Sequence, residues 1–258
     1  MKRFLAGLAV VASLTGGVRQ AAANLLVNGG FETSEVIETH LPSTTGHWAA
    51  DGGTILAPEN GIVPVEGDQM LRFDFTGFGT ASGRISDQWQ LIDVTSLSSV
   101  IAGGLVTATA SAQFNRVAGG SQTDTQFGIT LAAINGNPSE FDDYQPNLVP
   151  FLASTHNSVF TDGHASSWET ATANLTLPSN TTYLAVDLLA FENIYANSTS
   201  PEFDGHYVDN AVVSLTVIPE PSTLLVWSLL AGFGIGYGWY RRVTPGTPAS
   251  QHRAMSAR

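Results

Sequence analysis

Alternation of apolar and polar residues dominates the middle of the chain and predicts β-strands. Seven runs are rich in Val, Ile, Thr and aromatic residues, and most are bounded by Gly, Asn, Pro or Ser. These runs are Leu71–Thr76, Ser86–Val94, Leu105–Asn115, Thr125–Ile134, Trp168–Leu177, Tyr183–Phe191 and Tyr207–Val217. No amphipathic helix is expected between them, and Ser139–His164 is expected to be a long loop with one short strand. The pattern predicts an all-β fold, a β-sandwich or jelly roll.

The N-terminus has the pattern of a secretory signal. Lys2 and Arg3 precede an apolar run, Phe4–Leu14, and the small residues Ala21–Ala23 follow. This order predicts a signal peptide over residues 1–23, with cleavage before Asn24. The alternative is an N-terminal membrane anchor that is never cut.

A second apolar stretch lies near the C-terminus. The twenty residues Pro221–Tyr240 carry no charge, and a helix of that length would span the roughly 30 Å hydrocarbon core of a bilayer. Arg241 and Arg242 follow as a stop, and a basic tail covers residues 243–258. The pattern predicts one transmembrane helix over 222–240 with a cytoplasmic tail. The alternative is a buried core helix of a soluble domain.

The region between the two ends is strongly acidic. Residues 24–221 hold three arginines, no lysine and all twenty-two acids, a formal net charge of −19. Such a field repels nucleic acid and anionic lipid surfaces and attracts cations, so no nucleic-acid partner is expected. The chain has no cysteine, so a hydrophobic core must stabilise the domain over residues 24–217.

The segment before the C-terminal apolar stretch resembles a known sorting signal. It carries the triplet Pro219, Glu220 and Pro221, followed by the apolar stretch and an arginine cluster. This order is similar to the PEP-CTERM family, and here it covers residues 218–242. The resemblance implies a Gram-negative host and processing by a membrane protease-transferase, an exosortase. It implies a protein that is inner-membrane anchored before processing and then lies at the cell surface or in the extracellular matrix. The tail after the arginines is longer than this family normally has.

Short motifs in the body resemble the galactose-binding-like jelly roll of many carbohydrate-binding modules. The opening run Asn24–Glu32 resembles that family's first strand, Gly67–Phe73 its next hallmark strand, and Tyr207–Val213 its closing strand. In that family the first and last strands lie together and often hold a structural calcium. The resemblance therefore implies Glu32 and Asp209 as calcium ligands, with carbonyls near Gly67 or Asp68. The alternative is that both acids only accept hydrogen bonds from backbone amides.

Sugar binding needs exposed rings beside hydrogen-bonding groups. Trp48, Trp89 and Trp168 lie in or beside apolar strands, where core packing is the better interpretation. Tyr144 and Tyr195 lie in polar stretches and are the candidate ligand-binding residues. We expect no enzyme, because no zinc spacing, nucleophile elbow or cysteine nucleophile is present.

These observations predict an exported, non-catalytic β-sandwich that binds or organises extracellular polysaccharide. Two alternatives stay open. One is a structural matrix protein without a glycan ligand, crosslinked by calcium through its acidic surface. The other is a polysaccharide hydrolase with a pair of carboxylates that the sequence does not single out.

Overall fold

The computed structural model describes residues 23–74, 79–80, 83–104, 106–117, 125–141, 151–162, 164–192, 205–217 and 221–243. The chain divides into two compact units, Met1–Val217 and Ile218–Arg258. The first unit is built from β-strands and the second contains one helix.

The strands of the first unit vary widely in length. They are β1 (Ala49–Ala50), β2 (Gly53–Leu56), β3 (Met70–Phe73), β4 (Gly79–Thr80), β5 (Gly83–Asp93), β6 (Val106–Arg116), β7 (Gln126–Ile134), β8 (Ala153–Phe160), β9 (Glu169–Thr176), β10 (Tyr183–Glu192) and β11 (His206–Val217). Short helical turns also occur: η1 (Thr95–Leu97), α2 (Ser98–Ala102) and η2 (Pro138–Glu140). The sequence predicted none of these turns.

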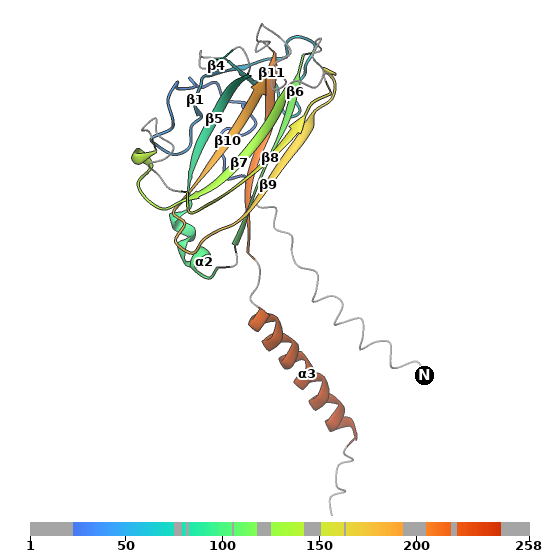
Figure 1. The fold of residues 1–258 in the computed structure, drawn as a ribbon. Coiled ribbons are helices and arrows are strands. Elements are labelled where there is room, and N and C mark those ends of the chain that lie inside the picture. The colour runs from blue at the N-terminus through green and yellow to red at the C-terminus, as the bar shows by residue number, and fades with distance from the viewer. Residues whose placement is uncertain are drawn as a thin grey trace, which may run out of the picture. The chain divides into compact units, whose positions relative to one another are not determined.

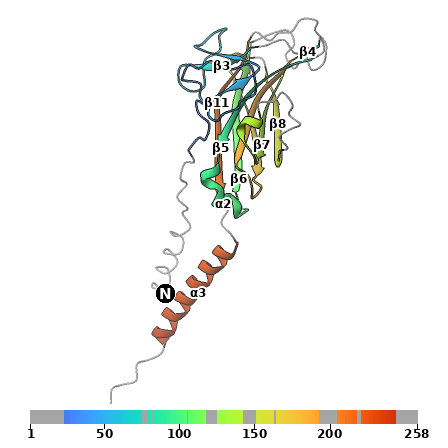
Figure 2. The same ribbon diagram turned by 90° about the vertical axis from the view of Figure 1, so that its left-hand side faces the viewer.

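The strands form two antiparallel sheets. Sheet A has the order β1-β5-β10-β7-β8, with β4 also paired to β5, and sheet B has the order β2-β3-β11-β6-β9. Some neighbouring strands are consecutive in sequence, as β2 and β3 or β7 and β8, whereas others are far apart, as β5 and β10 or β6 and β11. Figures 1 and 2 show the long strands running side by side along the domain. The fold is a β-sandwich, as the alternating pattern predicted.

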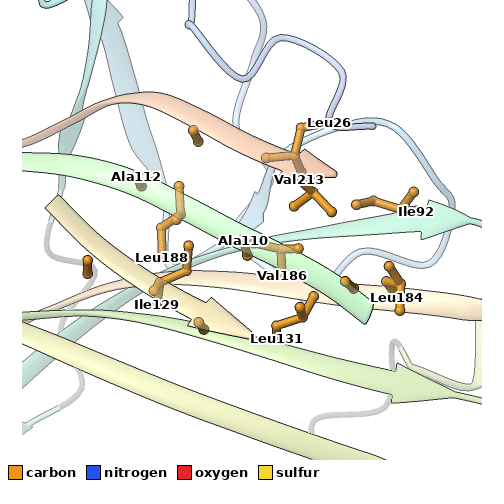
Figure 3. Packing of buried hydrophobic residues seen from close by; sticks show 14 of the residues in the cluster. Leu26, Ile92, Ala110, Ala112, Ile129, Leu131, Leu184, Val186, Leu188 and Val213 are labelled. Carbon is orange, nitrogen blue, oxygen red and sulfur yellow. The ribbon is translucent and has the colours of Figure 1, made fainter. Parts of the chain in front are cut away.

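The core lies between the two sheets. Alternate residues of β10, namely Leu184, Val186 and Leu188, face alternate residues of β6 that include Ala110 and Ala112. Figure 3 shows the larger side chains of one sheet lying over the alanines of the other. Small residues on β6 leave room for branched residues on β10, so the layers interdigitate and exclude water.

The predicted strands agree with the structure where the apolar pattern is long. Tyr183–Phe191 becomes β10 and Thr125–Ile134 becomes β7, each within one residue at its ends. The expected long loop Ser139–His164 contains β8, an edge strand of eight residues. This strand, ASTHNSVF, is polar on both faces, which is why its pattern was weak. The short strands β1 and β2 were not predicted.

The opening segment of the described chain lies against β11. Leu25 N–H donates to Val213 O at 2.8 Å, and Ala211 N–H donates to Gly29 O at 2.8 Å. The pairing of β11 with β6 shifts register between Asp209 and Val212, which marks a β-bulge. Asp209 lies directly before this bulge, near the start of β11, and Ala211, which pairs with the opening segment, lies within it.

The second unit is the helix α3 (Pro221–Val243). Its described side chains, residues 226–239, are exposed. No helix in the described part of the chain is both long and apolar enough to cross a membrane. The transmembrane span predicted for residues 222–240 is therefore not borne out among the described residues. The stretch lacks charge, but it is rich in glycine, tryptophan and tyrosine, which add little hydropathy. Its glycines are Gly232, Gly234, Gly236 and Gly238.

Candidate functional site

The outer face of sheet A carries a row of functional side chains across four strands. The register pairs Trp89 of β5 with Asp187 of β10, Asp187 with Thr130 of β7, and Thr130 with His156 of β8. Residues on either side of these along each strand, such as Leu188 and Ile129, point into the core. Because side chains alternate along a strand, the row lies on the face away from the core.

One half of this face is closed. Leu91, Ala132, Ile134 and Ala185 are buried there beneath a small apolar cluster that includes Phe141. Trp89 lies at the border, with its ring edge-on to the Phe141 ring at a centroid separation of 5.5 Å. This contact packs one side of the indole against the closed half.

The other half is open, and we name it the open half. Its members are Asp87, Trp89, Thr130, His156, Asp187 and Leu189. Trp89, Thr130 and Leu189 are half-buried, and His156 is exposed. Ile85 at 45% and Phe160 at 44% exposure extend the same face on β5 and β8. The open half therefore combines apolar surface with hydrogen-bonding groups.

Gly128 on β7 shapes the floor of the open half. A Cβ at this position would lie 2.6 Å from the His156 ring carbon Cε1 and 3.1 Å from Leu189 Cδ2. Any other residue would push these side chains away, so the glycine lets both lie across β7. The surface over β7 at Gly128 therefore carries no side chain, and the His156 ring and the Leu189 side chain lie on either side of it.

A hydrogen-bonded chain connects three members of the open half. The Thr130 hydroxyl donates to the Asp187 carboxyl group, and Thr130 Oγ1 lies 3.1 Å from His156 Nδ1. When the hydroxyl proton goes to Asp187, the bond to His156 needs the tautomer with the proton on Nδ1, which leaves Nε2 as an acceptor on an exposed side chain.

Three carboxyl groups cluster beside this chain. Asp87 N–H donates to Asp51 Oδ2 at 3.1 Å, and Asp51 N–H donates to Asp87 O at 3.1 Å. Burial, and then the charge of Asp51, raises the pKa of Asp87 to about 7. Burial, and then the charge of Asp87, raises the pKa of Asp187 well above its ordinary value, while the Thr130 bond opposes the rise. Near neutral pH at least one of the two groups is protonated, so the pair can both donate and accept hydrogen bonds.

The predicted metal ligands Glu32 and Asp209 lie close together at another place, beside the loop over residues 65–69. Asp209 is fully buried. Its Oδ2 accepts from Val65 N–H at 2.6 Å and from Glu66 N–H at 3.1 Å. Its Oδ1 accepts from Asn210 N–H at 2.6 Å. Burial raises the pKa of Asp209 to about 6, although the amide bonds lower it.

Glu32 holds the other end of the same loop. Its carboxylate accepts from Asp68 N–H at 2.9 Å and from Gln69 N–H at 3.1 Å. Gly67 approaches so closely that a Cβ there would lie 2.2 Å from the Glu32 carboxylate carbon. Together the two acids fasten the loop to the ends of the opening segment and of β11.

This geometry matches the amide-binding alternative rather than a calcium cradle. Calcium takes six to eight oxygen ligands, whereas the carboxylate oxygens of Glu32 and Asp209 already face N–H donors. Within the described residues, no three His, Cys, Asp or Glu side chains come together in a way that could hold a metal ion. The donor set found here therefore does not fit the ion.

Several other predicted residues fall where side chains are not described. Tyr144 and Tyr195 lie outside the described residues, as do Pro219 and Glu220. Pro221, Arg241 and Arg242 belong to α3, but only their backbone is described. The ligand-binding and sorting roles given to these residues stay predictions.

The core interpretation of the tryptophans holds fully for one of the three. Trp48 is fully buried against Phe31. Trp89 and Trp168 are half-buried and pack against two small apolar clusters, so they lie at the edge of the core and keep part of their surface exposed. Trp168 lines a cavity of about 300 Å³ with Val63 and Pro64, and its Nε1–H donates to Val63 O at 3.0 Å.

The sequence analysis missed Asp87, Asp187 and Thr130. Asp187 interrupts the apolar run of β10, YLAVDLLAFE, and a charged residue in such a run is a signal of function. That signal was present in the sequence. The closeness of Asp51 and Asp87 was not, because it depends on how the turn after β1 meets β5.

No family model matches the sequence, and no curated protein matches it. Among solved structures, TmCBM61 in complex with β-1,4-galactotriose aligns with a TM-score of 0.42 and 11% identity, covering 76% of this chain and 100% of that one. The Family 16 Carbohydrate Binding Module-2 aligns with a TM-score of 0.40 and 12% identity, covering 74% and 99%. The CBM22-1 xylan-binding domain from Paenibacillus barcinonensis aligns with a TM-score of 0.34 and 17% identity, covering 72% and 98%.

These structural neighbours are carbohydrate-binding modules. Their TM-scores all lie below 0.5, so the likeness carries no argument about the ligand of this chain. The β-sandwich rests on the strand pairing described above.

Proposed function

We propose that this protein binds polysaccharide on the open half of sheet A. The observation that carries the proposal is the placement of Trp89, a half-buried indole, beside the hydrogen-bonding groups of Asp187, Thr130 and His156. A pyranose ring has apolar faces and hydroxyl groups at its edge. A ring that stacks on an indole therefore needs donors and acceptors at the side of the stack. The open half supplies both.

The shape of the face supports an extended ligand. Exposed Ile85 and Phe160 lie on β5 and β8, on either side of the low floor at Gly128. A chain of sugar rings can lie across the strands and contact several of these groups at once. Each contact is weak, and the summed contacts supply the affinity.

The test compares two tryptophan variants of the full chain on an array of polysaccharides. Trp89→Ala should weaken binding about tenfold, because the lost stacking is on the order of 1.4 kcal/mol. Trp168→Ala is the matched control, since it removes another half-buried indole outside sheet A. Loss of binding in both variants, or in neither, would contradict the assignment to sheet A.

A hydrolase is the second candidate, and the Asp87–Asp187 pair is the observation that favours it. Paired carboxyl groups with different proton affinities are the groups that glycoside hydrolysis uses. Asp187 is 4% exposed, so its reach to a substrate is small. Release of reducing sugar by the purified protein, abolished by Asp187→Asn, would establish this function in place of simple binding. If the protein binds no polysaccharide on the array but self-associates when calcium is added, the result would instead support a structural matrix protein.

We further propose that the protein is exported, processed by a membrane exosortase, and then located at the cell surface or in the extracellular matrix. The support is the signal pattern over residues 1–23 and the triplet Pro219, Glu220 and Pro221. Mass spectrometry of the protein recovered from its host would show a new N-terminus at Asn24 and a C-terminus near the triplet. Recovery of the intact chain with both ends would overturn this proposal without affecting sugar binding.

A further inference from the structure

Negative charge gathers on the open half of sheet A, and none of the arginine side chains that the structure describes lies on this face. Asp87 and Asp187 lie diagonally across β5 and β10, and Asp51 meets Asp87 from the turn after β1. Among the arginine side chains that the structure describes, Arg72 is paired with Glu59 and Asp74 at β3. Arg116 is buried on β6 in sheet B. Neither belongs to this face.

One oxygen of this cluster is without a hydrogen bond. Asp187 is 96% buried, and its Oδ1 atom has no partner in the described structure. The Thr130 hydroxyl serves the Asp187 carboxyl group but leaves this oxygen unbonded. A buried acceptor without a donor costs about 1–3 kcal/mol. Because Asp187 is 4% exposed, a ligand hydroxyl recovers part of that free energy only if neighbouring side chains move to admit it.

We propose that the open half selects uncharged polysaccharides over anionic ones, and that Asp87 and Asp187 are the specificity-determining residues. This inference rests on the proposed polysaccharide binding and adds the charge class of the ligand. A neutral glycan offers hydroxyl donors to the carboxyl pair. A uronate or sulfate group would bring a further negative charge into a partly dehydrated acidic site, where repulsion is stronger than in water.

The selectivity depends on pH because the carboxyl pair titrates. The titratable groups facing the pair are Asp51 from the turn after β1 and His156 on β8, while β7 contributes the uncharged Thr130. Glycan carboxylates stay ionised above about pH 5. Ionisation of Asp87, whose pKa burial raises to about 7, therefore raises the repulsion on the protein side between about pH 5.5 and 8.

The experiment uses matched pairs of polymers with the full chain. The neutral probes are β-1,4-galactan, β-1,4-mannan and β-glucan, and each partner is the same polymer with its C6 hydroxymethyl groups oxidised to carboxylates. At pH 8 we expect the bound neutral polymer to be held at least about tenfold more tightly than its oxidised partner. At pH 5.5 the ratio should fall several-fold.

Substitutions show whether the discrimination comes from the carboxyl pair or from the net negative charge of the whole protein. Asp87→Asn/Asp187→Asn should lose most of the discrimination at pH 8, measured as the ratio of its affinities for the neutral polymer and the oxidised partner. Asp68→Asn removes one exposed acid next to β3 in sheet B and should leave the ratio unchanged. Asp87→Asn alone is the second variant, and it should lose part of the discrimination.

The outcomes distinguish this inference from the proposed function. Equal affinity for the two partners at pH 8, or full discrimination in the asparagine variants, would overturn the inference while polysaccharide binding stands. An equal loss in Asp68→Asn would assign the effect to net charge and would overturn it as well. If none of the probes is bound in either form, the proposed function fails and takes this inference with it.

Discussion

The two acid pairs of this domain differ in the polar groups that surround them. Glu32 and Asp209 accept hydrogen bonds from backbone amides of one loop and of Asn210. Asp87 and Asp187 have few donors, and Asp187 Oδ1 has none in the described structure. Both Asp209 and Asp187 are buried, so burial alone does not separate the pairs.

The pKa values follow this difference in donors. Burial raises the pKa of both buried acids, but three amide bonds limit the rise at Asp209 to about 6. Asp187 rises well above its ordinary value, with the Thr130 hydroxyl as the opposing bond. The comparison indicates that the first pair fastens the fold, whereas the second keeps unused hydrogen-bonding capacity on an accessible face.

The strongest test of this contrast removes the better-bonded acid. Asp209→Ala leaves the amides of Val65, Glu66 and Asn210 without their acceptor at a buried site. We expect a loss of about 3 kcal/mol, which corresponds to a Tm lower by about 6–12 °C for a domain of this size. Thermal unfolding followed by circular dichroism measures it. Asp68→Ala, an exposed neighbour, is the control, and an equal Tm for both variants would remove the structural role given to Asp209.

The second test compares stability across pH. The pKa values of Asp87, Asp187 and Asp209 are raised on folding, so the folded state binds more protons than the unfolded chain between about pH 4 and the folded pKa values. Stability from these groups is therefore complete at low pH and is lost as the pH rises through the folded pKa values, which are about 6 for Asp209 and about 7 for Asp87. We expect the Tm to fall between pH 5 and pH 8.

The variant Asp187→Asn sharpens this test because it removes the proton-binding group and keeps the shape. Its Tm should exceed that of the wild type by about 4 °C at pH 8 and should match it within about 1 °C at pH 5. A wild-type Tm that rises from pH 5 to pH 8, or a variant with an unchanged pH slope, would show that Asp187 is not held in its protonated form.

The sequence predicted the parts of the fold that repeat a local pattern. β7 and β10 were placed because their apolar residues recur over nine and ten positions. β8 was weakly predicted because its residues are polar on both faces, and β1 and β2 are too short to show a period. The pairing order depends on contacts between distant segments, which no local pattern contains.

The residues of the candidate sites also divide into those that the sequence predicted and those that it did not. Glu32 and Asp209 were predicted to meet, and they do so at one loop, because their motifs begin and end the domain. Trp89 was assigned to the core because β5 looked apolar, yet its alternation puts the ring on the outer face. The number of hydrogen-bond donors around Asp209 and around Asp187 does not follow from composition. The donors at Asp209 are backbone amides, which every residue but proline carries, so the residue types do not reveal them.

The smallest expected effect concerns calcium at the first pair. If the amides of Val65, Glu66, Asp68 and Gln69 are sufficient partners for Asp209 and Glu32, a metal chelator should change the Tm of the purified protein by less than about 1 °C. Calcium added at millimolar concentration should then have no further effect. Glu32→Ala measured with and without the ion is the control, because a bound ion would make the effect of the substitution depend on calcium. A Tm that rises with calcium in the wild type and not in Glu32→Ala would show that the ion replaces the amide donors at Glu32 and Asp209. The difference between this pair and the Asp87–Asp187 pair would then come from a bound metal and not from backbone amides.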